Sequence, residues 1–157
     1  MKIEQTTDLA ACLALRRTVF IEEQRVPEDR EIDGLDNSAL HLLATRDGQP
    51  IGSARILLDG DTGKIGRVCV LPQARGTGLG AALIRAALDV LRVQPGITRA
   101  KLGAQTHALG FYEKLGFTAQ TDFREGLAEL AEWVASQTAV DNVEKMRAEL
   151  DKRGLVA

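Results

Sequence analysis

An eight-residue stretch rich in glycine, residues 73–80, offers the clearest chemistry in this sequence. It reads Gln-Ala-Arg-Gly-Thr-Gly-Leu-Gly, follows a run of strand-forming residues that Pro72 ends, and leads into a regular amphipathic pattern over residues 78–93. Glycines that open a helix leave backbone N–H groups unpaired at the positive end of the helix dipole. The pattern therefore predicts an anion site, with phosphate as the usual anion, against the plainer interpretation of a helix-start turn alone.

The charges around this stretch favour an anionic ligand. The chain of 157 residues has a formal net charge of −2, yet residues 62–88 contain no Asp or Glu. The same segment carries basic side chains, among them Lys64, Arg67, Arg75 and Arg85. A slightly acidic protein whose glycine loop lies in an acid-free, basic segment is consistent with an anion bound there.

Two nucleotide-binding motifs resemble parts of the loop but fit poorly. Residues 76–81 satisfy the dinucleotide pattern G-x-G-x-x-A, but no Asp or Glu lies between Asp89 and Glu113 to bind a ribose. The strands before the loop also read as antiparallel hairpins rather than as a βαβ unit. A P-loop is excluded because the Gly-Lys pair at 63–64 is followed by isoleucine and lacks the first glycine. A nucleotide-binding domain is therefore the weaker alternative.

The elements that must position the loop follow from hydrophobic periodicity and turn residues. Alternating apolar residues predict three strands at residues 40–46, 51–58 and 64–71, with turns at Asp47-Gly48 and at residues 59–63. The other predicted elements are a strand at 2–6, helices at 9–20, 78–93 and 107–115, and strands at 100–104 and from Phe117. In the tail, residues 126–137 read as an amphipathic helix and residues 142–153 as a helix or a final strand.

Composition excludes several classes of protein. With 45% apolar and 27% charged residues, the chain is typical of one globular domain, and it lacks the basic excess of a dedicated nucleic-acid binder. No apolar run reaches the roughly 18 residues of a membrane span, and the N-terminus lacks a signal-peptide stretch. Cys12 and Cys69 are too few for a disulfide framework, and with two histidines they give no metal spacing. We therefore expect a cytoplasmic protein without metal, nucleic-acid or membrane partners.

Two ordered motifs resemble those of the GNAT N-acetyltransferase superfamily. Arg75-x-x-Gly78-x-Gly80, which follows the strand and Pro72, resembles motif A, and the Gly-Phe-Tyr-Glu-Lys-Leu-Gly-Phe run at 110–117 resembles motif B. Finer matches resemble the ElaA-like branch, namely Phe20-x-x-Glu23-Gln24-x-x-Pro27, Glu31-x-Asp33, His41, Ile65-Gly66-Arg67-Val68 and Leu102-Gly103-Ala104-Gln105. The resemblance spans about residues 9–117.

This resemblance implies the fold. The expected class is α/β (α+β), with a central, mixed but mostly antiparallel sheet flanked by helices. The sheet is expected to splay between the strand that holds residues 68–70 and the strand at 100–104. A single domain is expected to cover residues 1–157, with an extra helix and a final strand in the tail at 123–157. One departure is that the branch's Gly-Ile-Pro-His-like run after motif B is replaced here by Gly126-Leu127 and a helical pattern at 128–137.

The resemblance also implies acetyl-CoA as the acyl donor. Its pantetheine arm would pair like an added strand with the main chain of Val68, Cys69 and Val70. Gln105 would hold the cofactor or the acceptor. Arg75 would lie near the pyrophosphate as a charge. The pyrophosphate itself would rest on the backbone N–H groups of Gly76, Thr77, Gly78, Leu79, Gly80 and Ala81.

The implied reaction is direct attack of a primary amine on a thioester in a ternary complex. The amine must lose its proton, the carbonyl oxygen must be stabilised as it becomes negative, and the departing thiolate must be protonated. In the family, the main-chain N–H at the Val70 position faces the carbonyl and the Tyr112 position supplies the proton. The plainer interpretation of Tyr112, the chain's single tyrosine, is a packed ring with a satisfied hydroxyl. A covalent route through Cys69 is disfavoured, because the sequence pairs no histidine with it.

The sequence defines the acceptor side less sharply. Glu31, Asp33, His41 and His107 are candidate bases, a water chain is the alternative, and Arg67 is expected to face the acceptor. The plainer interpretation of His41 is a half-buried strand residue with satisfied hydrogen bonds, and that of His107 is a residue that caps or lines its helix. The acid-rich residues 22–36 would attract a cationic amine, or they form a solvated loop. The expected partner is a small-molecule or peptide amine, and the family's dimers imply a homodimer. The alternative function is a non-catalytic acyl-CoA-binding or regulatory module that keeps the loop without turnover.

Overall fold

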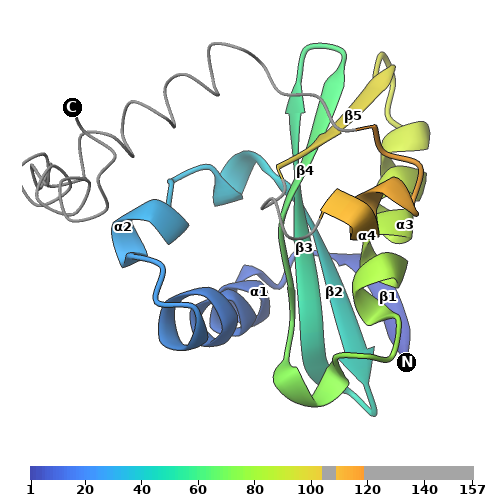
Figure 1. Cartoon of the computed structure of the whole chain (residues 1–157). Helices are drawn as coiled ribbons and strands as arrows, with labels where there is room; N and C mark the ends of the chain where they lie inside the picture. Colours follow the sequence, from blue (N-terminus) through green and yellow to red (C-terminus); the bar gives the residue numbers. More distant parts are fainter. Residues whose placement is uncertain (104–108, 119–157) are drawn as a thin grey trace, which may run out of the picture. The chain divides into compact units, whose positions relative to one another are not determined.

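A mixed sheet is the frame of the molecule (Figure 1). The computed structural model describes residues 1–103 and 109–118, and within them the sheet has five strands in the order β1-β2-β3-β4-β5. β1 to β4 pair antiparallel, whereas β5 runs parallel to β4. The predicted meander and the mostly antiparallel sheet are thus confirmed. The strands are β1 (Lys2–Thr6), β2 (Leu40–Arg46), β3 (Gln49–Asp59), β4 (Thr62–Val70) and β5 (Arg99–Leu102).

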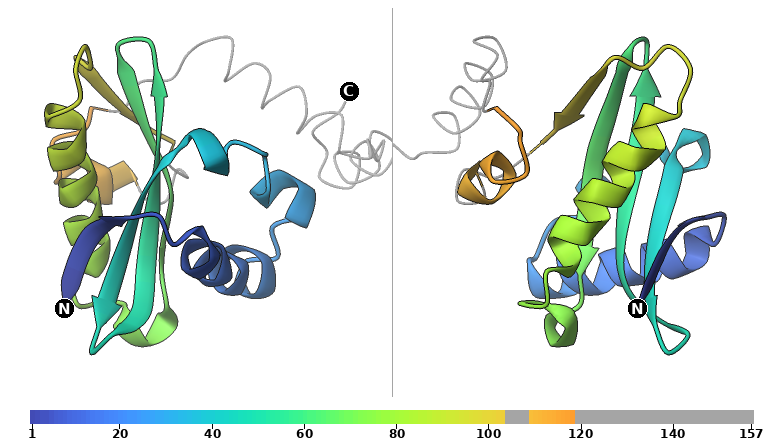
Figure 2. Two further views of the ribbon diagram at one scale, coloured as in Figure 1. Left: turned by 180° about the vertical axis from the view of Figure 1, so that it is seen from behind. Right: turned by 90° about the vertical axis from the view of Figure 1, so that its right-hand side faces the viewer.

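Helices cover both faces of the sheet (Figures 1 and 2). One face carries α1 (Leu9–Arg16), its π-helical continuation η1 (Arg17–Glu23) and α2 (Glu28–Glu31). The other face carries α3 (Leu79–Arg92) and α4 (Leu109–Glu113). Two short 3₁₀ turns, η2 (Asp36–Ser38) and η3 (Pro72–Ala74), precede β2 and the glycine loop.

The helix predicted at residues 9–20 differs from the observed one. Asp8 caps its start by accepting a hydrogen bond from the Ala11 N–H, as an N-cap aspartate does. The α-helical geometry ends at Arg16, and the wider turn of η1 carries the chain on to Glu23. Apolar spacing alone does not separate a π-helical turn from an α-helical one, because the two differ by about one residue per turn.

Side chains alternate between the two faces and form two separate cores. On β2, Leu42 and Ala44 pack with the buried face of α3, whereas Leu43 packs with the α1 side. The α1 core contains Cys12, Leu15 and Val19, and the α3 core contains Leu79, Leu83, Ile84, Ala87 and Leu91. This division is what a period of two predicts for a sheet buried on both sides.

β4 contains one extra residue relative to β3. Ser53 pairs with Cys69, but Arg55 pairs with Gly66, so one residue of β3, Ala54, opposes two residues of β4, Arg67 and Val68. Arg67 lies at this bulge with φ of 50°, a left-handed conformation that non-glycine residues rarely adopt. The bulge shifts the alternation by one position, and Ile65 and Val68 consequently both pack on the α3 side.

β4 loses its β5 partner beside the bulge. The parallel pairing of β4 with β5 runs from Thr62–Arg99 to Ile65–Leu102 and goes no further within the described residues. Among the described residues, 66–70 of β4 therefore pair with β3 on one edge only, and the expected splay of the sheet is confirmed.

Residues Met1–Phe117 form one compact unit. The tail elements expected at 126–137 and 142–153 lie outside the described residues. Of the strand expected from Phe117 onward, only Phe117 and Thr118 are described. The single domain over residues 1–157 thus stays an expectation. Over the described residues, every helix is too short or too polar to cross a membrane.

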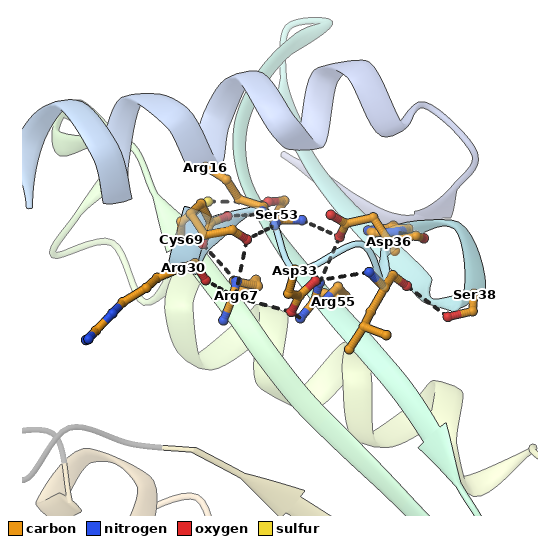
Figure 3. A network of polar contacts seen from close by, with 12 residues as sticks. Arg16, Arg30, Asp33, Asp36, Ser38, Ser53, Arg55, Arg67 and Cys69 are labelled. Atoms are coloured by element: carbon orange, nitrogen blue, oxygen red, sulfur yellow. Dashed lines mark hydrogen bonds and ion pairs between the residues drawn. The ribbon is translucent and has the colours of Figure 1, made fainter. Parts of the chain in front are cut away.

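An arginine–carboxylate cluster fastens the segment after α2 to the sheet and to α1 (Figure 3). Its acids all come from residues 31–36, whereas each arginine comes from a different element: α1, β3 and β4. The six members are Arg16, Arg55, Arg67, Glu31, Asp33 and Asp36.

Opposite charges inside the cluster are matched and hydrogen-bonded. Arg16, which is 1% exposed, binds both Glu31 and Asp36. Arg55 binds Asp33 through two hydrogen bonds of 2.6 and 2.7 Å and binds Asp36 at 3.0 Å. Burial raises the pKa of Asp36, but hydrogen bonds from Arg16 and Arg55 outweigh burial and hold that pKa below its usual range. Removal of one member would leave its partners charged and poorly solvated.

Replacement of Arg16 by methionine should therefore lower the free energy of unfolding by about 3–5 kcal/mol, because Glu31 and Asp36 lose a buried partner. Urea denaturation measures the change. The matched control is Arg92→Met, which removes a pair with Asp89 whose side chains are 72% and 68% exposed, and it should cost less than about 1 kcal/mol. Equal losses in the two variants would show that the cluster does not stabilise the fold.

The contact between β4 and α3 gives a second prediction. A Cβ on Gly63 would lie 2.1 Å from Leu91 Cδ2, whereas a Cβ on Gly66 would meet nothing within 4 Å. Gly63→Ala should therefore destabilise the protein by about 1–3 kcal/mol through overpacking. Gly66→Ala on the same strand is the control in thermal denaturation. A Tm for Gly63→Ala no lower than that of Gly66→Ala would contradict close packing of α3 at this point.

Candidate functional site

A cleft of about 550 Å³ lies along residues 68–70 of β4, beyond the last pairing with β5 in the part of the chain that the structure describes. Its walls come from β4, the glycine loop, the start of α3, α4 and the end of η1. It brings together nine of the predicted cofactor-binding residues, namely Val68, Cys69, Val70, Arg75, Gly76, Gly78, Leu79, Gly80 and Ala81. Tyr112 lines the same cleft, so residues from two separate sequence motifs meet there.

The glycine loop forms the helix end that the sequence predicts. Gly76 and Gly78 have φ of 75° and 81°, which side-chain-bearing residues rarely adopt. α3 begins at Leu79, and within the described residues no side chain caps its N–H groups. Thr77 does not line the cleft, and its hydroxyl donates to the Ala74 carbonyl at 2.7 Å. The first turn of α3 therefore offers backbone N–H groups and the helix dipole to the cleft.

Arg75 makes contacts that the sequence did not suggest. Its Nε donates to the Val70 carbonyl at 3.0 Å, and its two terminal nitrogens donate to the two carboxylate oxygens of Glu23, each at 2.6 Å. The hydrogen bonds from Arg75 hold the pKa of Glu23 below its usual range, and the pair is therefore ionised at neutral pH. The loop is thereby connected to η1.

Tyr112 is half-buried between two other rings. Its ring meets that of Phe111 edge-on with centroids 5.0 Å apart and that of Phe117 with centroids 6.4 Å apart. Burial raises the pKa of its phenol above the usual value, so the hydroxyl stays protonated at neutral pH. A protonated phenol beside an anion-binding helix end can donate a hydrogen bond or a proton to a group in the cleft.

The residues predicted for the acceptor side do not line this cleft. Glu31, Asp33 and Arg67 belong to the arginine–carboxylate cluster, and none of them lines the cleft. Arg67 Nε lies 2.8 Å from Glu31 Oε2 without hydrogen-bond geometry, and its Nη2 donates to the carbonyl oxygens of Arg30 and Glu31 at 2.9 and 3.2 Å. Two hydrogen bonds from Arg55 hold the pKa of Asp33 far below its usual range. A carboxylate held in this way is a poor proton acceptor.

His41 and the acidic stretch also have partners in the fold. His41 is buried, and its Nε2 lies 2.9 Å from the Asp36 carbonyl oxygen, to which it donates. Most of the acids in residues 22–36 form ion pairs with arginines, namely Glu23, Glu28, Glu31, Asp33 and Asp36. The expectation of an acidic surface that attracts a cationic amine is therefore not supported, since these charges are neutralised within the fold. Gln105 and His107 lie outside the described residues.

Both cysteines are free and buried. Burial raises the pKa of the Cys12 thiol to about 11, and it also raises the pKa of Cys69, whose Sγ lies 3.3 Å from Ser53 Oγ. A thiol with a raised pKa is a poor nucleophile, which agrees with the expectation of a packed strand residue. Within the described residues, no group of three His, Cys, Asp or Glu side chains could hold a metal ion.

Sequence reasoning did not assign five residues at the cleft. Val19, Gln24, Ala74 and Phe111 line it, and Glu23 binds Arg75 at its wall. Phe111 lies within the motif-B run, and Glu23 and Gln24 lie within the match at residues 20–27. The motifs therefore include these three residues, but they do not indicate what the side chains contact. The missing information was that η1 turns back toward a loop about fifty residues later in the chain.

Comparisons with known proteins agree with this arrangement. The sequence pattern of the acetyltransferase (GNAT) family matches residues 9–117. The Bacillus subtilis (strain 168) protein YyaT is 39% identical over 119 residues, which are 74% of this chain and 80% of that protein. The Escherichia coli (strain K12) protein ElaA is 33% identical over 123 residues, which are 76% of this chain and 80% of that protein.

Solved structures give the same result. The crystal structure of E. coli ElaA has a TM-score of 0.70 at 30% identity and covers 78% of this chain and 90% of its own. An acyl-CoA N-acyltransferase from Pseudomonas aeruginosa has a TM-score of 0.68 at 37% identity and covers 77% of this chain and 92% of its own. Sequence motifs, sheet topology and relatives all lead to one conclusion: the chain belongs to the GNAT acetyltransferase family.

Proposed function

We propose that this protein transfers an acetyl group from acetyl-CoA to a primary amine by direct attack in a ternary complex. The observation that carries the proposal is the single cleft in which the glycine loop, the unpaired part of β4 and Tyr112 meet. The loop offers an anion site, the strand offers an edge for hydrogen bonding, and the phenol offers a proton. The substrate that needs all three is an acyl thioester with a phosphate-bearing tail.

The start of α3 suits the pyrophosphate of coenzyme A. The N–H groups of Leu79, Gly80 and Ala81 belong to the first turn of α3, and all three residues line the cleft. A Cβ on Gly80 would already lie 3.8 Å from Phe111 Cζ, so larger side chains there would narrow the space between α3 and α4. Glycine keeps the backbone accessible to a phosphate group.

The unpaired edge of β4 suits the pantetheine arm. Residues 66–70 have β3 on one side only within the described residues, which leaves main-chain groups of the other edge for an extended, amide-bearing ligand. Acetyl-CoA supplies the activated acetyl group. Val70, at the end of the strand, would direct its N–H toward the thioester carbonyl and stabilise the negative charge that develops there.

Tyr112 is the proposed acid, because its phenol is protonated at neutral pH and lines the cleft in which the thiolate would form. For the base, Glu31 and Asp33 are poor choices because arginines hold their carboxylates, and His41 is a poor choice because it is buried and does not line the cleft. A water chain and His107 are the two remaining alternatives for removal of the amine proton. The acceptor is proposed to be a small-molecule or peptide amine.

The second candidate function is a non-catalytic acyl-CoA-binding module. It is favoured by the position of three of the four predicted bases, Glu31, Asp33 and His41, none of which lines the cleft. Binding of acetyl-CoA is common to both functions, so only turnover separates them. A panel of amines assayed for thiol release from acetyl-CoA makes the distinction, and no release with any amine would favour the binding module.

Acetyl-CoA should raise the Tm of the protein, whereas NAD and ATP should not, because only acetyl-CoA matches both the loop and the strand edge. At 100 times Kd, the ligand should add about 2.7 kcal/mol to the free energy of unfolding. Gly78→Val should abolish most of this shift, since a side chain would block the backbone at the anion site.

Gly48→Val is the matched control for that variant. Gly48 and Gly78 have φ of 77° and 81°, and a Cβ on either would meet nothing within 4 Å, so the two variants carry the same backbone strain. The control should lose stability but keep the full shift with acetyl-CoA. A larger shift with NAD than with acetyl-CoA would overturn the assignment of the loop.

Tyr112→Phe should lower kcat about 10²-fold with little change in the KM for acetyl-CoA, because the ring packing remains while the proton donor is lost. Steady-state kinetics with an active amine measures both constants, and thermal denaturation checks that the fold is intact. An unchanged kcat would assign Tyr112 to packing alone.

A further inference from the structure

The Arg75 guanidinium binds both the Glu23 carboxylate and the Val70 carbonyl oxygen in this structure. The inference drawn from these contacts rests on the proposed function. We infer that Arg75 is a positioning residue, held by Glu23, that fixes the end of β4 at Val70, and that it is not a ligand of the pyrophosphate. The pyrophosphate then depends on the backbone N–H groups of the loop and of α3.

The planar guanidinium of Arg75 donates a hydrogen bond from each of its three nitrogens. Both terminal nitrogens contact Glu23 at 2.6 Å, which is the bidentate geometry that arginine forms with a carboxylate. The remaining nitrogen, Nε, donates to the Val70 carbonyl at 3.0 Å. A planar group held at all three nitrogens has one orientation, and a lysine ammonium cannot reproduce this arrangement.

This contact fixes one particular peptide unit. The Val70 carbonyl accepts from Arg75, and the N–H of the same peptide unit, that of Leu71, donates to the Ile51 carbonyl at 2.9 Å. The peptide after Val70 is thus held by Arg75 on one side and by β3 on the other. The N–H of Val70, which belongs to the preceding peptide, takes its direction from this anchor.

The charge of Arg75 is already neutralised. Glu23 and Arg75 form an ion pair with no net charge, and a neutral pair attracts a pyrophosphate far less than a free guanidinium does. Their side chains are 38% and 42% exposed, and such pairs contribute modestly to stability. The role that fits this pair is orientation of the strand end rather than stability of the fold.

The π-helical turn brings Glu23 to this position. The Gln24 N–H donates to the Val19 carbonyl at 3.1 Å and the Val26 N–H to the Phe20 carbonyl at 2.9 Å, so the chain turns more widely than an α-helix. Glu23 then faces a loop that lies 52 residues later in the sequence. Wide turns of this kind occur often at functional sites.

Two acyl donors separate positioning from phosphate binding. Acetyl-CoA carries the pyrophosphate, and S-acetyl-pantetheine lacks it. Three variants should each lower kcat/KM about tenfold or more, and by the same factor with both donors: Arg75→Gln, Arg75→Lys and Glu23→Gln. The reason is that the Arg75–Glu23 pair positions the thioester end of the donor, which both donors share. Affinity for 3′-phosphoadenosine 5′-diphosphate, the phosphate-bearing part of coenzyme A, should stay within about twofold of wild type.

A phosphate ligand would behave differently. Arg75→Gln would then lose activity with acetyl-CoA only and would bind 3′-phosphoadenosine 5′-diphosphate more weakly, Arg75→Lys would largely restore both, and Glu23→Gln would strengthen binding by freeing the guanidinium. Any of these results would overturn the inference. Arg92→Gln, which breaks an exposed pair on α3 away from the cleft, is the control and should change neither donor's kinetics.

The experiment also separates this inference from the function on which it rests. Failure of the wild-type chain to bind coenzyme A or to turn over acetyl-CoA would overturn the proposed function. If the wild-type chain turns over normally but the Arg75 variants lose activity with acetyl-CoA and not with S-acetyl-pantetheine, the proposed function stands. Only the positioning role of Arg75 would then be wrong. The Tm of each variant shows whether a loss of activity comes from unfolding.

Discussion

The bulge in β4 is the constraint on which the site depends. One extra residue opposite β3 changes which face of the sheet the following side chains occupy. Arg67 then faces the α1 side, where it joins the cluster, while Val68 and Val70 pack on the α3 side. The strained conformation of Arg67 persists because its guanidinium is held by Glu31 and Asp33 and by backbone carbonyls of the same segment.

The place where β4 leaves β5 explains why the cleft forms there. In the described part of the chain, pairing with β5 stops after Ile65, and α3 and α4 lie together on one face of the sheet. η1 lies on the opposite face and ends beside the glycine loop (Figures 1 and 2). The cleft along residues 68–70 of β4 is therefore lined by η1 from one face of the sheet and by α3 and α4 from the other. A cleft of this kind needs a sheet that opens, since a fully paired strand would offer no edge.

Charge is distributed for internal contacts more than for the surface. The net charge of −2 is an average over an acid-rich segment and an acid-free one. In the fold, arginines from α1, β3 and β4 neutralise the acids of residues 31–36, and Arg75 neutralises Glu23. These pairs join segments that are distant in sequence, and so they set the geometry of the site instead of acting as free charges toward a ligand.

The sequence by itself determined the features that depend on neighbouring residues. The Asp47-Gly48 hairpin, the start of α3 at the glycines and the two-sided strand pattern all follow from local backbone preferences and from periodicity, which act over a few residues. The grouping of the loop with Tyr112 followed from motif resemblance, and the structure places both at one cleft.

Only the tertiary structure decided the partners of the charged residues. Glu31, Asp33 and His41 have the side chains of candidate bases, but their hydrogen bonds and ion pairs involve residues from other elements. The bulge at Arg67 and the contact of Arg75 with Glu23 are likewise invisible in sequence. The physical reason is that an ion pair or a strand register is set by the three-dimensional approach of distant segments, and the spacing of residues along the chain does not encode that approach.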